Sequence, residues 1–294
     1  PKGKTIALVG QSGSGKSTVA RCIMNLYHNG SGEVYYNGIL LHDRKAYRKM
    51  HRQIQQNIQI IFQDSTSSLN PRMKVKDIIT EPLVINRIRP KRGTYREEAA
   101  FQMKYVGLDE SFLDKYPGEL SGGQRQRVAI ARAVIMEPEL LIADEPIASL
   151  DVSIQAQILN LIRELQNELG LTSLFVGHGL GAVRYVSDRI AVMYLGKIVE
   201  IADAGEVFMH PVHPYTKALT QAAPVADPGR REEKSAVLTG EVASAVHPPK
   251  GCRFHPRCPY AREDCSVSEP MLLPMAEKPD HLVACPYYEG TETA

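Results

Sequence analysis

Short apolar runs alternate with longer amphipathic patterns along most of the chain. Four of the runs have the length of buried strands, at residues 5–9, 59–62, 140–143 and 174–176. Helical patterns occupy residues 16–26 and 153–169, and Gly170 is a natural C-terminal stop for the second of them. Strands that alternate with helices in this way predict an α/β fold built on a parallel sheet.

The pattern at residues 153–169 has the period of an amphipathic helix. Six apolar residues recur at this period and are predicted to share one face toward the core: Ile154, Ile158, Leu161, Ile162, Leu165 and Leu169. The sequence therefore predicts that this helix packs against the sheet.

Three segments depart from the alternation of strands and helices. Apolar runs at residues 189–193 and 197–201 predict a β-hairpin. Residues 64–120 contain few β-branched runs and several helical patches, which predicts a mostly helical insertion. After about residue 227, Pro, His and Cys become frequent and the helical periodicity ends. We therefore expect an irregular, Cys-rich C-terminal extension.

The chain length supports a division into one large and one small part. Its 294 residues are enough to bury a full core. Residues 1–228 are predicted to form one α/β domain, with a helical subdomain inserted at about 64–128. Residues 229–294 are predicted to form the C-terminal extension.

Charge and hydropathy give no support for two classes of protein, nucleic-acid binders and membrane-spanning chains. Lys and Arg number 35 and Asp and Glu number 33, so the net charge of +2 gives no support for a nucleic-acid partner. No apolar run approaches the ~20 residues that a membrane span needs. Any membrane contact is therefore expected to go through a partner.

The glycine-rich stretch after the first apolar run fits the phosphate-loop pattern G-x-x-x-x-G-K-[ST]. Glycines let the backbone curl so that successive N–H groups point at phosphate oxygens, and the following helix adds its positive end. Lys16 is predicted to bind the β- and γ-phosphates, and the Ser17 hydroxyl to bind Mg²⁺. The predicted ATP contacts of this loop are Gly10, Ser12, Gly13, Ser14, Gly15, Lys16, Ser17 and Thr18.

Two carboxylates end the apolar run at 140–143, where ligands bind in open α/β sheets. Asp144 is predicted to hold Mg²⁺ through water, and Glu145 to polarise an attacking water. Together with the phosphate loop, this pair predicts a P-loop NTPase with a RecA-like sheet.

A third motif resembles the signature of the ATP-binding-cassette family. Residues 120–124 read Leu-Ser-Gly-Gly-Gln and precede Arg125 and Arg127. The resemblance implies that this segment contacts the γ-phosphate held by another subunit, through Ser121, Gly122, Gly123 and Gln124. The same residues would also serve as an ordinary helix N-cap.

Three more positions match this family in order along the chain. Gln63 matches the glutamine that reaches Mg²⁺ and water, and Asp151 matches the aspartate of the loop after the carboxylates. His178 matches the histidine that touches the γ-phosphate. The resemblance therefore implies that Glu145, His178 and Gln63 are the catalytic residues.

The chain departs from the family pattern at three places. Gly179 replaces the Asp that usually follows the histidine, and Ala148 lies where the family favours Ser. The family's adenine-stacking aromatic would lie before Pro1. These departures predict weaker closure or nucleotide binding.

Two C-terminal stretches, at residues 213–219 and 251–259, resemble the peptide-importer branch of the family, the oligopeptide/dipeptide (peptide/nickel) importers. Residues 62–64 and 68–72 also resemble it. Importers of this branch use two paired ATPases. The stretch 68–72 ends in Pro71 and Arg72, and this ending indicates the second of the two.

Four of the five cysteines lie in the last fifth of the chain, with the spacing C-x5-C-x6-C-x19-C. Soft thiolates suit iron–sulfur clusters or zinc, and disulfides are disfavoured in a cytosolic chain. The resemblance implies a [4Fe–4S] cluster, with zinc or no metal as the alternatives. The predicted ligands are Cys252, Cys258, Cys265 and Cys285.

The resemblance implies an ATP-hydrolysing translocase subunit that powers peptide import from the cytoplasmic face of the cell membrane, with ATP and Mg²⁺ as cofactors. The implied partners are a second ATPase subunit in a head-to-tail heterodimer, two transmembrane permease subunits and, indirectly, an extracytoplasmic peptide-binding protein. Two alternatives stay open: another cargo such as nickel chelates, and a catalytically weakened cassette.

Overall fold

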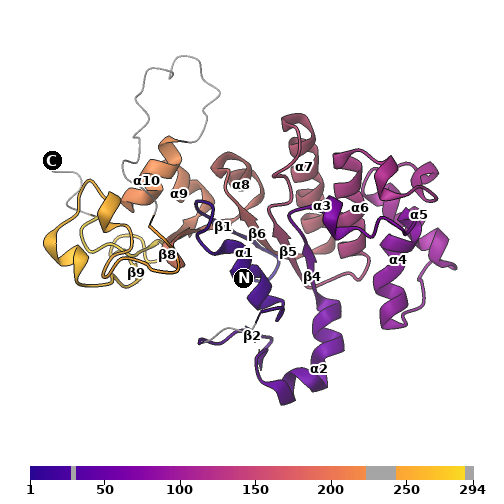
Figure 1. Cartoon of the computed structure of the whole chain (residues 1–294), viewed down its shortest axis with the longest axis horizontal. Coiled ribbons are helices and arrows are strands. Elements are labelled where there is room, and N and C mark those ends of the chain that lie inside the picture. The colour runs from indigo at the N-terminus through magenta and orange to yellow at the C-terminus, as the bar shows by residue number, and fades with distance from the viewer. Residues whose placement is uncertain (28–30, 223–242, 289–294) are drawn as a thin grey trace. The chain divides into compact units, whose positions relative to one another are not determined.

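The computed structural model describes residues 1–27, 31–222 and 243–288 (Figure 1). The chain divides into two compact units, one of Pro1–Lys4 with Ser17–Val176 and one of Thr5–Lys16 with Gly177–Ala294. The domain boundary predicted between residues 228 and 229 lies outside the described residues. The predicted domain limits therefore stay a prediction.

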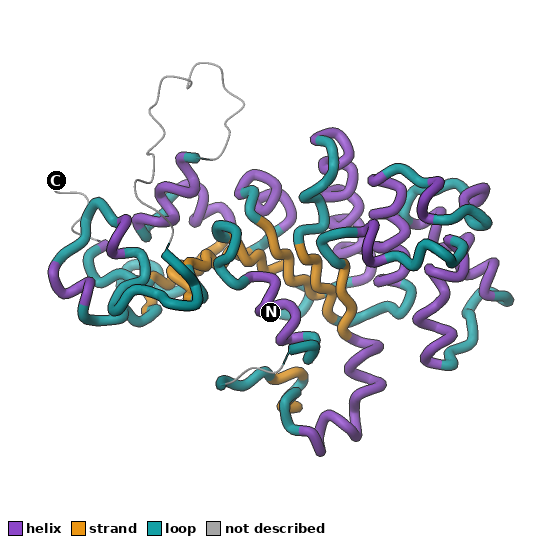
Figure 2. The backbone as a smooth tube through the Cα atoms, viewed as in Figure 1, coloured by secondary structure: helices purple, strands orange, loops and turns teal. Residues whose placement is uncertain are grey.

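The first unit contains three parallel strands, in orange in Figure 2. Their order is β4 (Ile58–Ile61), β5 (Leu140–Asp144) and β6 (Thr172–Gly177). The register pairs Ile60 with Ile142, and Ile142 with Leu174. These runs are buried and apolar because a parallel sheet is covered on both faces. The three predicted strands are confirmed, each shifted or extended by one or two residues.

Helix α7 (Val152–Leu169) ends as predicted at Gly170, which adopts a left-handed conformation. Four of the six residues on its predicted core face, Ile158, Leu161, Ile162 and Leu165, are buried, and so is Leu159, which was not predicted. The prediction for Leu169 is wrong, since its side chain is 37% exposed. Leu169 lies in the last turn of the helix, beside the cap.

The segment predicted to be helical carries no strand among its described residues (Figure 1). It contains α3 (Ser65–Ser68), α4 (Val75–Asn86), α5 (Tyr95–Tyr105) and α6 (Gly122–Val134), and two short 3-10 helices at Glu110–Phe112 and Pro117–Glu119. α4, α5 and α6 pack against one another. Thr94 begins α5 with a capping box that includes Glu97.

Several local elements of the first unit were not predicted. Helix α2 (Arg44–Asn57) and the small hairpin of β2 (Tyr35–Tyr36) and β3 (Ile39–Leu40) precede β4. Helix α1 (Lys16–Ile23), by contrast, was predicted, and it begins at the expected residue but is shorter than expected. Helix α2 is rich in basic and amide side chains, and the two hairpin strands have only two residues each, so no apolar run marks these elements in the sequence.

The second unit contains a mixed sheet. β1 (Thr5–Val9) pairs in parallel with β7 (Arg189–Tyr194), which forms the predicted hairpin with β8 (Lys197–Asp203). Leu195 and Gly196 both have positive φ, of 42° and 83°, as a two-residue hairpin turn requires.

The last described segment of the chain joins this sheet. β10 (Leu282–Val283) pairs with β8 and with β9 (Leu273–Pro274). The remaining helices of the unit are α8 (Leu180–Val186), α9 (Ala204–Met209) and α10 (Pro214–Gln221), with 3-10 turns at His255–Arg257 and Glu263–Ser266. A separate, wholly irregular Cys-rich extension is therefore not confirmed.

Candidate nucleotide site

The phosphate loop of the second unit is curled around its own lysine. Lys16 is only 4% exposed, and its Nζ donates to the carbonyl oxygens of Gly10 at 2.9 Å and Gln11 at 3.1 Å. The Ser14 N–H also donates to the Gln11 carbonyl, at 3.2 Å. Lysine carries three donors, so the ammonium can rest on the loop and still reach a phosphate.

Gly10 is required by a close approach of the backbone. A Cβ at this position would lie 2.1 Å from the carbonyl oxygen of Met193 on β7. No side chain tolerates that distance, so the start of the loop is fixed against the neighbouring strand. This position needs glycine for packing, in addition to the curvature of the loop.

Ser14 has the environment expected of a ligand-binding hydroxyl. Its side chain is 3% exposed, and its Oγ has no hydrogen-bond partner among the described residues. A buried hydroxyl without a partner is costly and unusual. A phosphate oxygen on the loop would satisfy it, so the loop fits a nucleotide. Ser12, Gly13 and Thr18 are exposed.

Two oxygen donors suited to Mg²⁺ meet in the first unit. The Ser17 Oγ donates to Oδ1 of Asp144 at 2.8 Å, and Asp144 is buried at the end of β5. Hydroxyl and carboxylate oxygens are the hard ligands that Mg²⁺ prefers, usually together with water and phosphate. These two residues therefore fit a magnesium ion.

Glu145 follows Asp144 in the chain, and its side chain contacts that of Gln63. Gln63 Nε2 donates to Oε2 of Glu145 at 3.0 Å. Glu145 has a φ of 46°, in the left-handed region that a non-glycine residue rarely adopts. Its N–H donates to the Val176 carbonyl at 2.9 Å. Such strain is held by the surrounding structure and concentrates at functional sites.

The signature segment forms the N-terminus of α6. Ser121 is the N-cap: its Oγ accepts from the Gln124 N–H at 3.3 Å, and Gln124 Oε1 accepts from the Ser121 N–H at 2.8 Å. A Cβ at Gly123 would lie 2.7 Å from Cγ2 of Ile154 on α7. The N-cap interpretation is therefore correct locally. Because Ser121 is exposed, it can cap the helix and also contact a phosphate.

The remaining predicted residues lie at helix starts. Asp151 is the N-cap of α7 and makes no side-chain capping bond. His178 is exposed and precedes Gly179, the N-cap of α8. A Cβ at Gly179 would meet nothing within 4 Å, so nothing in the packing of the described residues requires glycine there.

The predicted cysteine site is wrong. Among the described residues no group of three or more His, Cys, Asp or Glu is placed to hold a metal ion, and this range includes Cys252, Cys258, Cys265 and Cys285. All four are free thiols that line an apolar pocket. Burial raises the pKa of Cys258 and of Cys285 to about 11, so both thiols are protonated near pH 7. The described residues therefore support neither an iron–sulfur cluster nor a zinc ion at these cysteines.

Two residues that touch the phosphate loop were missed as site residues. The Gln11 N–H donates to the Tyr215 hydroxyl at 2.9 Å, and Arg257 donates to the Gln11 Oε1 at 3.1 Å. Both belong to the C-terminal stretches that the sequence assigned to the importer branch. That resemblance was the available signal, but it did not predict that either residue contacts the phosphate loop.

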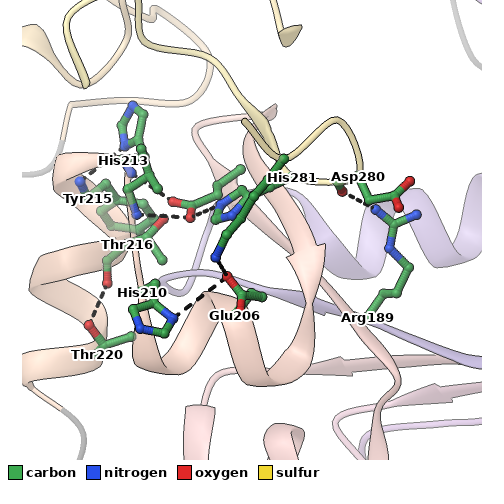
Figure 3. Close-up of polar contacts among 12 residues, drawn as sticks. Arg189, Glu206, His210, His213, Tyr215, Thr216, Thr220, Asp280 and His281 are labelled. Carbon is green, nitrogen blue, oxygen red and sulfur yellow. Dashed lines mark hydrogen bonds and ion pairs between the residues drawn. The ribbon is translucent and has the colours of Figure 1, made fainter. Parts of the chain in front are cut away.

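A buried histidine begins α10 (Figure 3). His213 is the N-cap, and its Nδ1 accepts from the Tyr215 N–H at 3.1 Å. The buried Glu200 carboxylate accepts from the His213 N–H at 2.8 Å and pairs with His281 Nε2 at 2.7 Å. Burial lowers the pKa of His213 to about 4, against the opposing effect of Glu200. The ring is therefore neutral near pH 7 and can accept the capping bond.

We expect His213→Asn to make the free energy of unfolding less sensitive to acid than that of the wild type. The His213 pKa is about 4 in the folded chain and 6.5 as the unperturbed value, so the unfolded chain binds the proton first. Stability is then retained above pH 6.5 and lost as the pH falls toward 4, by about 2 kcal/mol between pH 7.5 and 5. Asn keeps a capping oxygen but does not titrate.

Denaturant unfolding at the two pH values measures this effect. His210→Asn, at an exposed histidine at the end of α9, is the matched control and should retain the wild-type loss. An equal acid loss in His213→Asn and wild type would contradict the prediction.

The geometry defines the class of protein: a P-loop nucleotide-binding protein with a phosphate loop, a strand-end Asp and an adjacent Glu. The ABC transporter family model matches residues 1–148, and the model "Oligopeptide/dipeptide transporter, C-terminal region" matches residues 199–265. The chain belongs to the ABC transporter family, and the prediction that it is an ATPase of this class is confirmed.

Named relatives resemble the chain over nearly its whole length. It is 45% identical over 293 residues to the putative oligopeptide transport ATP-binding protein YkfD of Bacillus subtilis, covering 99% of this chain and 88% of that protein. It is 46% identical to the oligopeptide transport ATP-binding protein OppF of Salmonella typhimurium, covering 92% and 81%. It is 44% identical to the dipeptide transport ATP-binding protein DppF of Haemophilus influenzae, covering 97% and 85%.

Solved structures support the same fold. CbiO1 of Clostridium perfringens, part of the ABC transporter complex CbiONQ, has a TM-score of 0.62 and 31% identity, covering 71% of this chain and 80% of that chain. The ATP-binding cassette MJ0796, solved as a dimer bound to ADP and Pi after hydrolysis, has a TM-score of 0.60 and 31% identity, covering 69% and 87%. The predicted cassette fold is confirmed. No helix in the described ranges is long and apolar enough to cross a membrane.

Proposed function

We propose that this chain hydrolyses ATP to power the import of peptides, as the ATPase subunit of an ABC importer. The observation that carries the proposal is the full-length similarity to oligopeptide and dipeptide transport ATP-binding proteins, at 44–46% identity. The match to the oligopeptide/dipeptide C-terminal region, at residues 199–265, supports it, because this part lies beyond the cassette match.

The site residues have distinct proposed roles. Lys16 and the loop N–H groups bind the phosphates of ATP, and Ser14 donates to one of their oxygens. Ser17 and Gln63 bind Mg²⁺, with Asp144 acting through water. The ion, when bound, neutralises charge on the β- and γ-phosphates. Glu145 accepts the proton of the attacking water, and its bond to Gln63 orients the carboxylate.

The signature segment has a proposed role between subunits. A helix N-terminus with exposed N–H groups and a serine hydroxyl attracts an anion. We propose that Ser121, Gly122, Gly123 and Gln124 contact the γ-phosphate on a second ATPase subunit, in a head-to-tail pair. His178 and Asp151 act in the same closed state. The second-ATPase assignment predicts that the partner is a different chain.

The remaining partners follow from the proposed cargo. Two transmembrane permease subunits form the path, and an extracytoplasmic peptide-binding protein delivers the peptide to them. The helical segment that contains α3–α6 is the proposed contact with the permeases. The chain then acts at the cytoplasmic face of the membrane as a peripheral subunit.

Reconstitution tests the cargo and the activity together. The chain, its partner ATPase and the permeases are placed in vesicles with the binding protein, and ATP hydrolysis and uptake are measured with a peptide or with a nickel chelate. We expect the peptide alone to stimulate hydrolysis and to enter the vesicles. Stimulation by the nickel chelate alone, or hydrolysis without any uptake, would contradict the proposal.

A further inference from the structure

Two C-terminal stretches of the second unit reach the phosphate loop, although they take no direct part in the proposed hydrolysis. Residues 213–219 begin α10, and residues 251–259 contain the 3-10 turn His255–Arg257. Both contact Gln11, the second residue of the loop. Separate parts of the chain therefore converge on one residue of the nucleotide site.

Tyr215 is held firmly in place. It is fully buried in the first turn of α10, where its N–H donates to His213 Nδ1 (Figure 3). Its ring packs against Tyr194 and Phe254, with centroids 4.6 and 5.5 Å away. Its hydroxyl accepts the Gln11 N–H at 2.9 Å. Burial raises the pKa of Tyr215 to about 12, so the hydroxyl stays neutral.

Arg257 approaches the same loop residue through its side chain. Arg257 is 8% exposed, and its Nη1 donates to the Gln11 Oε1 at 3.1 Å. Its Nε has no hydrogen-bond partner, and no carboxylate pairs with it in the described part of the chain. A buried cation without an acid is costly. A polyanion on the adjoining loop would reduce that cost.

Gln11 connects these contacts to the lysine of the loop. Its carbonyl oxygen accepts from Lys16 Nζ at 3.1 Å and from the Ser14 N–H at 3.2 Å. The N–H, the carbonyl and the side-chain oxygen of Gln11 are thus all engaged. A shift of Gln11 would displace the carbonyl oxygen that accepts hydrogen bonds from Lys16 and from Ser14.

We propose that Tyr215 and Arg257 are positioning residues of the nucleotide site, which hold Gln11 so that the phosphate loop is ordered before ATP binds. The proposal rests on the proposed function, because it assumes that the loop binds ATP. Binding of ATP to a disordered loop would cost conformational entropy. A loop that is already ordered avoids this cost, so the main effect is on the affinity for ATP. The chemical step depends on other groups.

Hydroxyl deletion at Tyr215 tests the first contact. Tyr215→Phe is compared with Tyr194→Phe, which removes a hydroxyl from the same aromatic cluster without a bond to the loop. Binding of a fluorescent ATP analogue with Mg²⁺, the KM for ATP, kcat and Tm are measured on the assembled transporter. We expect Tyr215→Phe to raise Kd and KM about fivefold, the effect of one hydrogen bond, with kcat and Tm like those of Tyr194→Phe.

A double-mutant cycle tests the second contact. Arg257→Gln and Gln11→Ala should each weaken ATP binding. Because both substitutions remove the same contact, the double variant should bind ATP no more weakly than the single variant with the lower affinity. Additive losses would overturn the role of Arg257. Equal Kd and KM in Tyr215→Phe and Tyr194→Phe would overturn the role of Tyr215.

The wild type and Lys16→Ala separate this inference from the proposed function. Absence of ATP binding by the wild-type transporter would overturn the proposed function, and this inference with it. Binding by the wild type that is lost in Lys16→Ala, with no change in the Tyr215 and Arg257 variants, would overturn this inference alone.

Discussion

Glu145→Gln should reduce the ATPase kcat by about 10²–10⁴-fold while leaving the affinity for ATP close to that of the wild type, because a general base contributes that much to the rate. The amide keeps the size of the side chain but cannot accept the proton of water. Single-turnover hydrolysis and equilibrium ATP binding on the assembled transporter measure the two quantities separately.

Glu137→Gln is a close control for this change. Glu137 is exposed and also has a left-handed φ, of 50°, so the substitution makes the same chemical change in the same backbone conformation. It should leave kcat unchanged. A wild-type rate in Glu145→Gln would show that Glu145 is not the base. A joint loss of binding would indicate a structural role for this carboxylate.

The second large effect is expected at Lys16. Lys16→Ala should weaken ATP binding about 100-fold, since a hydrogen bond from a charged group contributes about 1.5–3 kcal/mol and each 1.4 kcal/mol is tenfold in affinity. The substitution also removes the donor to the Gly10 and Gln11 carbonyls, which loosens the loop. Titration with a fluorescent ATP analogue in the presence of Mg²⁺ measures the change.

Lys197→Ala is the control for charge. Lys197 lies at the start of β8 in the same unit and pairs with Glu269 on the surface. Its removal changes the net charge by the same amount and should not affect ATP binding. If both variants bind ATP like the wild type, the loop is not the phosphate site.

Much of the site was predictable because its signals are local. The phosphate loop, the strand-end pair Asp144 and Glu145, and the hairpin turn each depend on a few consecutive residues whose backbone geometry is fixed by their types. Apolar runs marked β4, β5 and β6 because parallel strands are buried on both faces. The sequence also placed Gln63 at the end of β4, and the structure adds its bond to Glu145.

The sequence alone thus determined the nucleotide-binding class, the positions of the main strands along the chain and the residues proposed for chemistry. Only the tertiary structure decided three other matters. It joined Tyr215 and Arg257 to Gln11, it left Leu169 exposed beside its cap, and it placed the four C-terminal cysteines as half-buried free thiols, with no metal-holding group among the described residues. The physical reason is the same in each case. Contacts and solvent exposure are set by how distant parts of the chain pack together, and the spacing of residues in the sequence does not specify that packing.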